Sequence, residues 1–129
     1  AVPDLQKAIS RFLEDFGLTF NGTEDVEAAK TTTAFFPVAG TQIELVHPLN
    51  GEGPIAKYLE KNGKGGIHHI CFRSDNILED VAMLQGKGYQ FLSDAPTPGA
   101  HGCQVIFIHP KCCDGVLIEI NQPADDHHH

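Results

Sequence analysis

The sequence is poor in positive charge, and this scarcity limits the partners that the protein can have. Only 9 lysines and arginines stand against 17 aspartates and glutamates, which gives a formal net charge of −8 at pH 7. A general nucleic-acid-binding surface needs a basic face, so we expect no nucleic-acid partner. An anionic small molecule is not excluded, because a few local lysines are enough to bind it.

Long apolar runs and paired cysteines are missing as well. No stretch approaches the ~18 apolar residues of a membrane-spanning helix, so we expect no membrane partner. The four cysteines contain no C-x-x-C pair, which argues against a zinc-thiolate site and favours reduced thiols in an intracellular protein. No leader segment is visible. We interpret residues 127–129, all histidine, as the remnant of a purification tag.

An internal repeat is the most informative feature that is present. A helical pattern of apolar residues runs from Leu5 to Gly17, and a second runs from Asp75 to Gly88. Similar predicted strands follow both helices: 18–20, 31–38 and 41–47 in the first half, and 89–92, 104–109 and 116–120 in the second. The second half also opens with a strand at 67–73, of which the first half keeps only Ala1 and Val2.

These patterns predict an α+β fold built from two repeated βαβββ modules. The modules span about 1–50 and 66–124, and a helix at about 54–62 joins them into a single domain, 1–126. We expect each module to form a curved four-stranded sheet with its helix on the outer face. The two sheets would make one curved mixed sheet whose inner faces form a metal-binding cleft.

Two glutamates occupy matching positions in the repeat, within Gly40–Pro48 and Gly115–Pro123. Because side chains alternate along a strand, Glu44 and Glu119 should face the cleft while their apolar neighbours pack under a helix. For one such carboxylate, an exposed edge or a salt bridge would be the simpler interpretation. Two at matching positions favour a functional site.

A histidine joins these glutamates. In the strand 67–73, His69 shares a face with Arg73, which indicates the inner side, whereas His68 shares a face with Ile70 and should lie on the packed side. A lone strand histidine is usually structural. Next to two inward carboxylates, however, an imidazole suits zinc, cobalt, manganese or iron. Lys111, in a loop, could bind a phosphate or carboxylate, although such lysines are more often only solvated.

Several segments resemble the methylmalonyl-CoA epimerase family of the vicinal-oxygen-chelate superfamily. They cover nearly the whole chain in order, and their combination is specific to this family: Ala1–Leu5, Gly53–Leu59, Gly65–Ile70, Pro98–Gly102, and His109–Lys111 running into Gly115–Glu119. The resemblance implies an isomerase, usually a homodimer, in the cytoplasm of a bacterium or the mitochondrial matrix of a eukaryote. Its substrate would be methylmalonyl-CoA.

The resemblance also implies one divalent metal ion, such as Co²⁺, Zn²⁺ or Mn²⁺. Its ligands would be Glu44, His69, Glu119 and a histidine on the first strand. Counting back from the second helix places that histidine two or three residues upstream of Ala1, so we expect the natural chain to extend there. We add a loop lysine and a glycine-rich loop as substrate-binding candidates: Lys111, His101 and Gly102.

Epimerisation implies an acid and a base on opposite faces of C2, and Glu44 and Glu119, from opposite modules, are the candidates. Some family members carry a glutamate on the preceding strand and a glutamine at the position of Glu44. Here the earlier place falls near Thr33. Two alternatives stay open: another metal-dependent enzyme of the superfamily, either a glyoxalase-type isomerase or a dioxygenase, and a non-enzymatic small-molecule-binding module.

Overall fold

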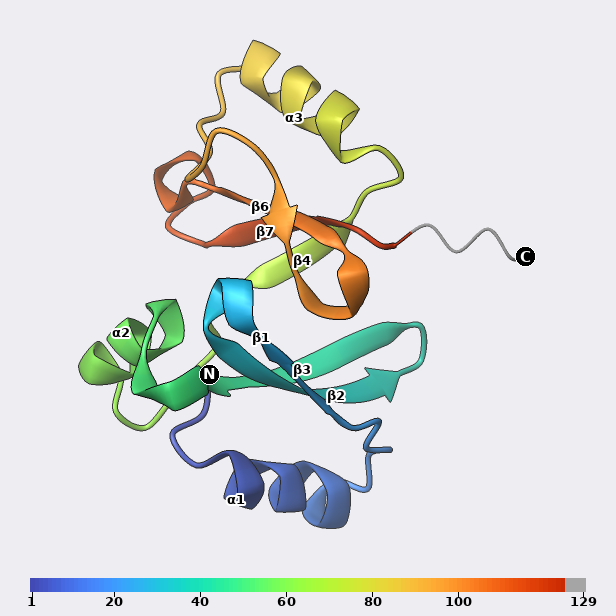
Figure 1. Ribbon diagram of the computed structural model, residues 1–129, viewed down its shortest axis with the longest axis vertical. Coiled ribbons are helices and arrows are strands. Elements are labelled where there is room, and N and C mark those ends of the chain that lie inside the picture. The colour runs from blue at the N-terminus through green and yellow to red at the C-terminus, as the bar shows by residue number, and fades with distance from the viewer. Residues whose placement is uncertain (125–129) are drawn as a thin grey trace. The chain divides into compact units, whose positions relative to one another are not determined.

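The computed structural model describes residues 1–124; residues 125–129, including the histidines interpreted as a tag, lie outside the described part. The chain divides into two compact units, Ala1–Ile67 and His68 onward (Figure 1). Each unit contains one sheet with a helix on it. The α+β class predicted from the sequence is therefore confirmed. None of the described helices is long and apolar enough to cross a membrane.

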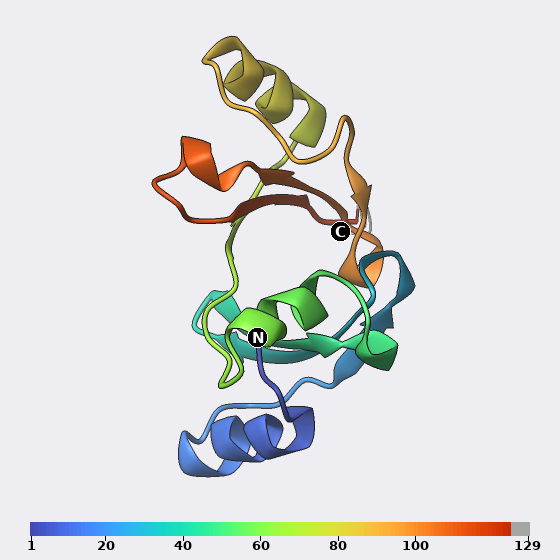
Figure 2. The ribbon, with the colours of Figure 1, turned by 90° about the vertical axis from the view of Figure 1, so that its left-hand side faces the viewer.

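The first unit contains a three-stranded antiparallel sheet in the order β1-β2-β3. Figure 2 shows α1 against one face of this sheet. Its elements are α1 (Leu5–Ser10), a π-helical turn (Arg11–Asp15), β1 (Thr23–Val26), β2 (Thr31–Val38), β3 (Thr41–Pro48) and α2 (Pro54–Lys61), with short 3-10 turns at Glu27–Ala29 and Leu49–Gly51.

Capping and packing explain where α1 begins and what it covers. The carboxylate of Asp4 accepts a hydrogen bond from the Lys7 backbone N at 3.1 Å, which satisfies an otherwise unpaired amide of the first turn. The buried face of α1 then packs on the sheet, where Phe36 has no exposed surface. This first core contains Ala8, Ile9, Ala34, Phe36 and Leu45.

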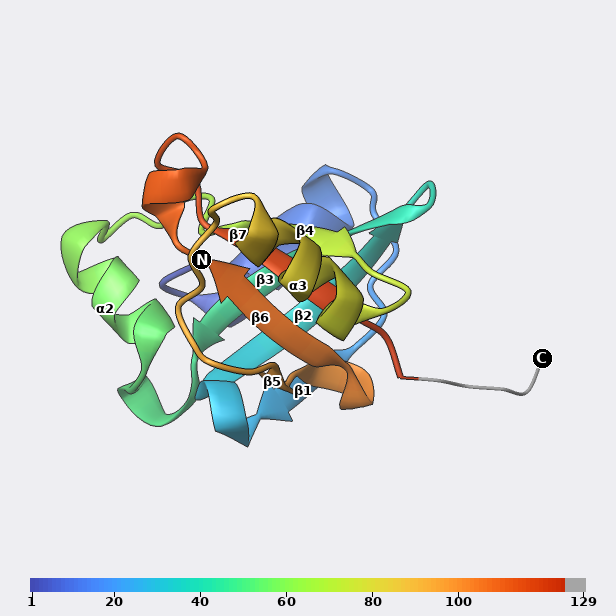
Figure 3. The same ribbon diagram turned by 90° about the horizontal axis from the view of Figure 1, so that it is seen from above.

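The second unit contains a four-stranded sheet in the order β4-β7-β6-β5, in which only β4 and β7 are parallel. Helix α3 covers one face of this sheet (Figure 1, Figure 3). The elements are β4 (Ile70–Arg73), α3 (Ile77–Gly86), β5 (Thr97–Pro98), β6 (Gln104–Ile108) and β7 (Ile118–Gln122), with 3-10 turns at Ala100–Gly102 and Pro110–Cys112.

The start and the packing of α3 repeat those of α1. The Asn76 side chain accepts from the Glu79 backbone N at 3.2 Å, in the same capping role as Asp4. The second core contains Ile77, Val81, Ile106, Ile108 and Ile120. Two sequence positions that the repeat aligns therefore both begin a helix that covers a sheet.

Two equivalent backbone hydrogen bonds, one in each unit, show which residues of the sequence repeat correspond. Val2 N donates to Val46 O at 3.0 Å, and Ser74 N donates to Asn121 O at 2.7 Å. Val46 and Asn121 each lie two residues after the matching glutamates, so Val2 corresponds to Ser74. The residues before α1 thus run beside β3 as β4 runs beside β7.

Two predicted strands do not form as strands in the structure. Residues 18–20 form no strand; β1 begins only at Thr23, after Gly17 and Gly22, which both take positive φ. Leu18 and Phe20 instead pack on the core without a ladder. Residues 89–92 contribute a single bridge, between Phe91 and Ile108.

The strand expected at 67–73 begins at 70, and the one expected at 116–120 runs from 118 to 122. Gly115 ends the preceding turn at positive φ, and Val116 N still bonds to Cys113 O, which delays the ladder. All four cysteines are free thiols, as predicted.

Candidate active site

The side-chain alternation of β7 directs Glu119 away from α3. Ile118 and Ile120 pack on the core beneath the helix, so Glu119 lies on the opposite face. Its cross-strand neighbours are Cys71 on β4 and Phe107 on β6. Paired residues of adjacent strands project to the same side of a sheet, so these three side chains form a row across the sheet.

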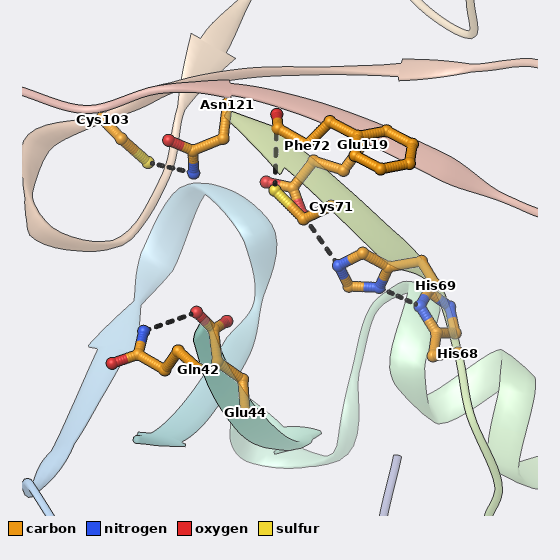
Figure 4. Close-up of polar contacts among 9 residues, drawn as sticks. All are labelled: Gln42, Glu44, His68, His69, Cys71, Phe72, Cys103, Glu119 and Asn121. Carbon is orange, nitrogen blue, oxygen red and sulfur yellow. Dashed lines mark hydrogen bonds and ion pairs between the residues drawn. The ribbon is translucent and has the colours of Figure 1, made fainter. Parts of the chain in front are cut away.

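His69 forms a pair with Glu119, the central member of this row (Figure 4). His69 lies one residue before β4, and its Nε2 is 2.8 Å from Glu119 Oε1. Their side chains are only 20% and 13% exposed. The ring of Phe107 stands edge-on to the imidazole, with centroids 5.4 Å apart. The pair therefore has an apolar wall on one side.

His68 contacts His69 directly, which the sequence did not predict. Their Nδ1 atoms are 2.9 Å apart, and the two rings meet edge-to-face (Figure 4). The prediction that His68 lies on the packed side, away from His69, is wrong. Because β4 begins only at Ile70, strand alternation does not extend to these two residues. Burial, and then the neighbouring His69, lower the pKa of His68 to about 4, so its ring is neutral at pH 7.

A second polar contact lies two residues further along β7. The Asn121 side-chain N donates to Cys103 Sγ at 3.2 Å, and Cys103 is buried. Asn121 projects from the same face as Glu119 because both occupy alternate positions of the strand. The contact fixes the amide orientation on the face that carries the histidine–glutamate pair.

Glu44 has an equivalent cross-strand neighbour in the first unit, although Glu44 itself is exposed. It lies on β3 opposite Phe35 of β2, which is 1% exposed, while Leu45 packs beneath α1 on the other face. Gln42 Nε2 donates to Glu44 Oε2 at 3.0 Å. Each of the two matching glutamates therefore has a phenylalanine beside it on the neighbouring strand, a correspondence that only strand pairing reveals.

The same face of the first sheet carries a second carboxylate, which the sequence analysis missed. Glu24 on β1 is the cross-strand partner of Thr33, and Thr33 lies two residues before Phe35, so Glu24 and Glu44 project from one face. The glutamate that some family members place near Thr33 thus has a spatial counterpart here. The signal was the alternation of residues 23–26, which the wrongly placed strand at 18–20 concealed.

The remaining candidates lie at the two ends of β6. His101 and Gly102 form the turn before this strand, and Lys111 lies exposed in the turn after it. The Lys111 backbone N bonds to His109 Nδ1 at 3.1 Å, which shapes that turn. The two turns cannot converge on one small group, although a long ligand could extend from one to the other.

His69 and Glu119 fit part of a metal-ligand set, since an imidazole nitrogen and a carboxylate oxygen face each other at 2.8 Å. A divalent ion inserted between them would need further ligands. Within residues 1–124, no three His, Cys, Asp or Glu side chains are grouped so that they could hold a metal ion.

Comparisons with known proteins identify the family of the chain. Residues 1–107 match the Glyoxalase/Bleomycin resistance protein/Dioxygenase superfamily. The chain is 42% identical over 122 residues to the mitochondrial methylmalonyl-CoA epimerase of Mus musculus, a match covering 95% of this chain and 68% of the mouse protein. It is also 42% identical over 123 residues to an ethylmalonyl-CoA/methylmalonyl-CoA epimerase of Cereibacter sphaeroides, covering 95% of this chain and 92% of that one.

Solved structures give the same result. A variant of Streptomyces coelicolor methylmalonyl-CoA epimerase, in complex with 2-nitronate-propionyl-CoA, superimposes with a TM-score of 0.89 and 30% identity. The match covers 96% of this chain and 92% of that chain. The chain therefore belongs to the methylmalonyl-CoA epimerase family of the glyoxalase superfamily.

Proposed function

We propose that the chain interconverts (R)- and (S)-methylmalonyl-CoA by removing the proton at C2 and returning it on the opposite face. One observation carries this proposal beyond family membership: His69 and Glu119, fifty residues apart in sequence, meet at 2.8 Å on the sheet face opposite α3. Among the relatives, the mouse protein is named for this reaction, and the Streptomyces complex contains a propionyl-CoA nitronate.

The substrate dictates what the site must do. C2 lies between a thioester carbonyl and a carboxylate, so loss of its proton gives an enolate whose negative charge spreads over the thioester oxygen. The protein must supply a base on one face of C2, an acid on the other face, and positive charge or hydrogen-bond donors near the developing enolate oxygen.

Glu119 is the first candidate for proton transfer. Its carboxylate is oriented by the hydrogen bond to His69, and the Phe107 ring packs against that imidazole. A carboxylate held this way loses little side-chain freedom when substrate arrives, which favours a productive geometry. In the proposal, a Glu119 oxygen takes the C2 proton from one stereoisomer and donates one to the enolate in the reverse direction.

Glu44 is the candidate for the opposite face of C2. Gln42 orients its carboxylate, and the repeat gives it the same cross-strand phenylalanine environment as Glu119. Glu24, on the same sheet face as Glu44, is a further carboxylate for this role. Replacing each of these three glutamates with glutamine tests their roles, because a residue that transfers protons must lower the exchange rate at C2 when it is replaced.

One divalent metal ion, Co²⁺, Zn²⁺, Mn²⁺ or similar, is proposed with His69, Glu119 and Glu44 among its ligands. When bound, such an ion would neutralise negative charge on the enolate oxygen. Elemental analysis of protein purified without chelator tests the metal.

A homodimer is also proposed, and an intracellular location with it. The mouse relative is mitochondrial by name, and the Cereibacter relative is bacterial. Light scattering coupled to size-exclusion chromatography tests the dimer: a mass near twice the 14.0 kDa of the chain supports it, and a mass near that of one chain contradicts it.

Chiral analysis of the product tests the proposed reaction. Metal-loaded protein is incubated with (S)-methylmalonyl-CoA alone, and the two stereoisomers are separated over time. We expect the (R) form to accumulate until the two are present in similar amounts. A His69→Ala variant should leave the (S) form nearly unchanged. If the parent protein leaves it unchanged with metal restored, the proposed function is wrong.

A further inference from the structure

Both ring nitrogens of His69 have a partner in the second unit. Nε2 lies 2.8 Å from Glu119 Oε1, and Nδ1 lies 2.9 Å from His68 Nδ1 (Figure 4). A neutral imidazole carries one N–H and one lone pair, so its two partners cannot be chosen independently. Whatever happens at Nε2 therefore determines what Nδ1 requires from His68.

A neutral His69 can carry its one ring proton in two arrangements. When neutral His69 donates from Nε2 to Glu119, its Nδ1 is an acceptor and His68 must donate from Nδ1. When the His69 Nε2 lone pair binds a cation, the proton moves to Nδ1, and His68 must then accept at the same atom. Histidine can do both, because a neutral imidazole can carry its own proton on either nitrogen.

We propose that His68 is a positioning residue that holds His69 in the tautomer with its proton on Nδ1, so that Nε2 is free to bind a divalent metal. This inference rests on the metal site of the proposed function. A backbone carbonyl in the place of His68 could only accept a hydrogen bond. His68 can also donate, so it satisfies His69 in the metal-free protein, where Nε2–H bonds to Glu119.

Packing offers a competing account of the same contact. The His68 and His69 rings meet edge-to-face with centroids 5.1 Å apart, so His68 could act only by its shape. Two substitutions separate these roles. His68→Phe keeps an aromatic ring but has no nitrogen at the contact, whereas His68→Asn loses the ring but can place an amide oxygen near the position of Nδ1.

The test is the dissociation constant of Co²⁺, measured on the whole chain by competition with a chromophoric chelator. If His68 sets the tautomer, His68→Phe should bind Co²⁺ about 10- to 100-fold more weakly, and His68→Asn should remain within about threefold of the parent. If His68 acts only through packing, the order reverses and His68→Asn is the weaker binder. Urea unfolding of both variants verifies that they are folded.

Nuclear magnetic resonance of the zinc-loaded protein gives a readout that packing does not predict. The Nδ1 proton of His69 should be visible and slow to exchange with water in the parent and in His68→Asn, and it should be lost to exchange in His68→Phe. A parent that binds no Co²⁺ overturns the metal site and this inference with it. A parent that binds Co²⁺ no better than His68→Phe overturns the inference alone.

Discussion

Replacing Glu119 with glutamine should separate its catalytic role from its structural one. The substitution keeps the size of the side chain and leaves an amide oxygen to accept from His69 Nε2, which now lies 2.8 Å from Glu119 Oε1. What it removes is the negative charge and the ability to take up a proton. The site is only 13% exposed at Glu119, so solvent cannot readily supply a substitute base.

The two expected magnitudes are far apart. A hydrogen bond to a charged group contributes about 1.5–3 kcal/mol and a neutral one about 0.5–1.5 kcal/mol, so the free energy of unfolding should fall by only about 1 kcal/mol. Epimerisation should fall by about 100-fold or more, the usual scale for a lost general acid or base. A 100-fold loss corresponds to about 2.7 kcal/mol in the activation barrier.

Two measurements on the same preparation give both quantities. Urea titration gives the free energy of unfolding, and initial rates from each pure stereoisomer, at saturating Co²⁺, give the rate loss. Glu60→Gln is the matched control, because Glu60 is an exposed residue of α2 and the charge change is the same. Parent-like turnover by Glu119→Gln would refute its assignment as acid or base, even with the enzyme activity intact.

Four further outcomes are expected. Glu44→Gln should slow epimerisation by about 100-fold while one stereoisomer still exchanges its C2 proton; parent-like rates would remove Glu44 from the mechanism. His69→Ala should retain no stoichiometric metal by elemental analysis after dialysis, and full retention would contradict its role as ligand. Phe36→Ala, in the first core at 0% exposure, should lower the free energy of unfolding by about 3–5 kcal/mol in urea, and a loss below about 1 kcal/mol would contradict that packing. The pKa of His68 is about 4 in the folded protein, below its value of 6.5 in the unfolded chain. The neutral His68 side chain therefore contributes its full stabilisation above pH 6.5, and this contribution is lost as the pH falls to about 4. Urea titrations of metal-free parent and His68→Phe across that range should show a steeper pH dependence in the parent, and equal slopes would contradict it.

The sequence predicted the elements whose signals are local. Asp4 and Asn76 each precede an apolar pattern of helical spacing, and both are helix caps in the structure. The β2 strand occupies the predicted residues, and β3 extends the predicted strand by one residue. On β7, the alternation of side chains predicted that Glu119 lies on the face opposite α3, because only that orientation of the strand turns Ile118 and Ile120 toward the core.

The features that the sequence did not predict depend on where strand pairing begins. His68 and His69 were assigned to opposite faces on the assumption that the strand begins at 67, whereas the ladder begins at Ile70 and leaves both rings free to meet. Glu24 went unnoticed because Leu18 and Phe20 have strand-like composition, yet they pack on the core without belonging to a strand. Pairing and cross-strand neighbours are properties of the folded chain, and a single sequence shows them only indirectly.

Hydrogen exchange at C2 tests the central claim most directly. Metal-loaded protein is incubated with methylmalonyl-CoA in deuterated water, and mass spectrometry and proton resonance report the label at C2 of each stereoisomer. Removal and return of the C2 proton predict one deuterium at C2 in the product, at a rate that depends on Glu119 and Glu44. Conversion between stereoisomers without deuterium at C2, or no conversion by the metal-loaded parent, would contradict the account.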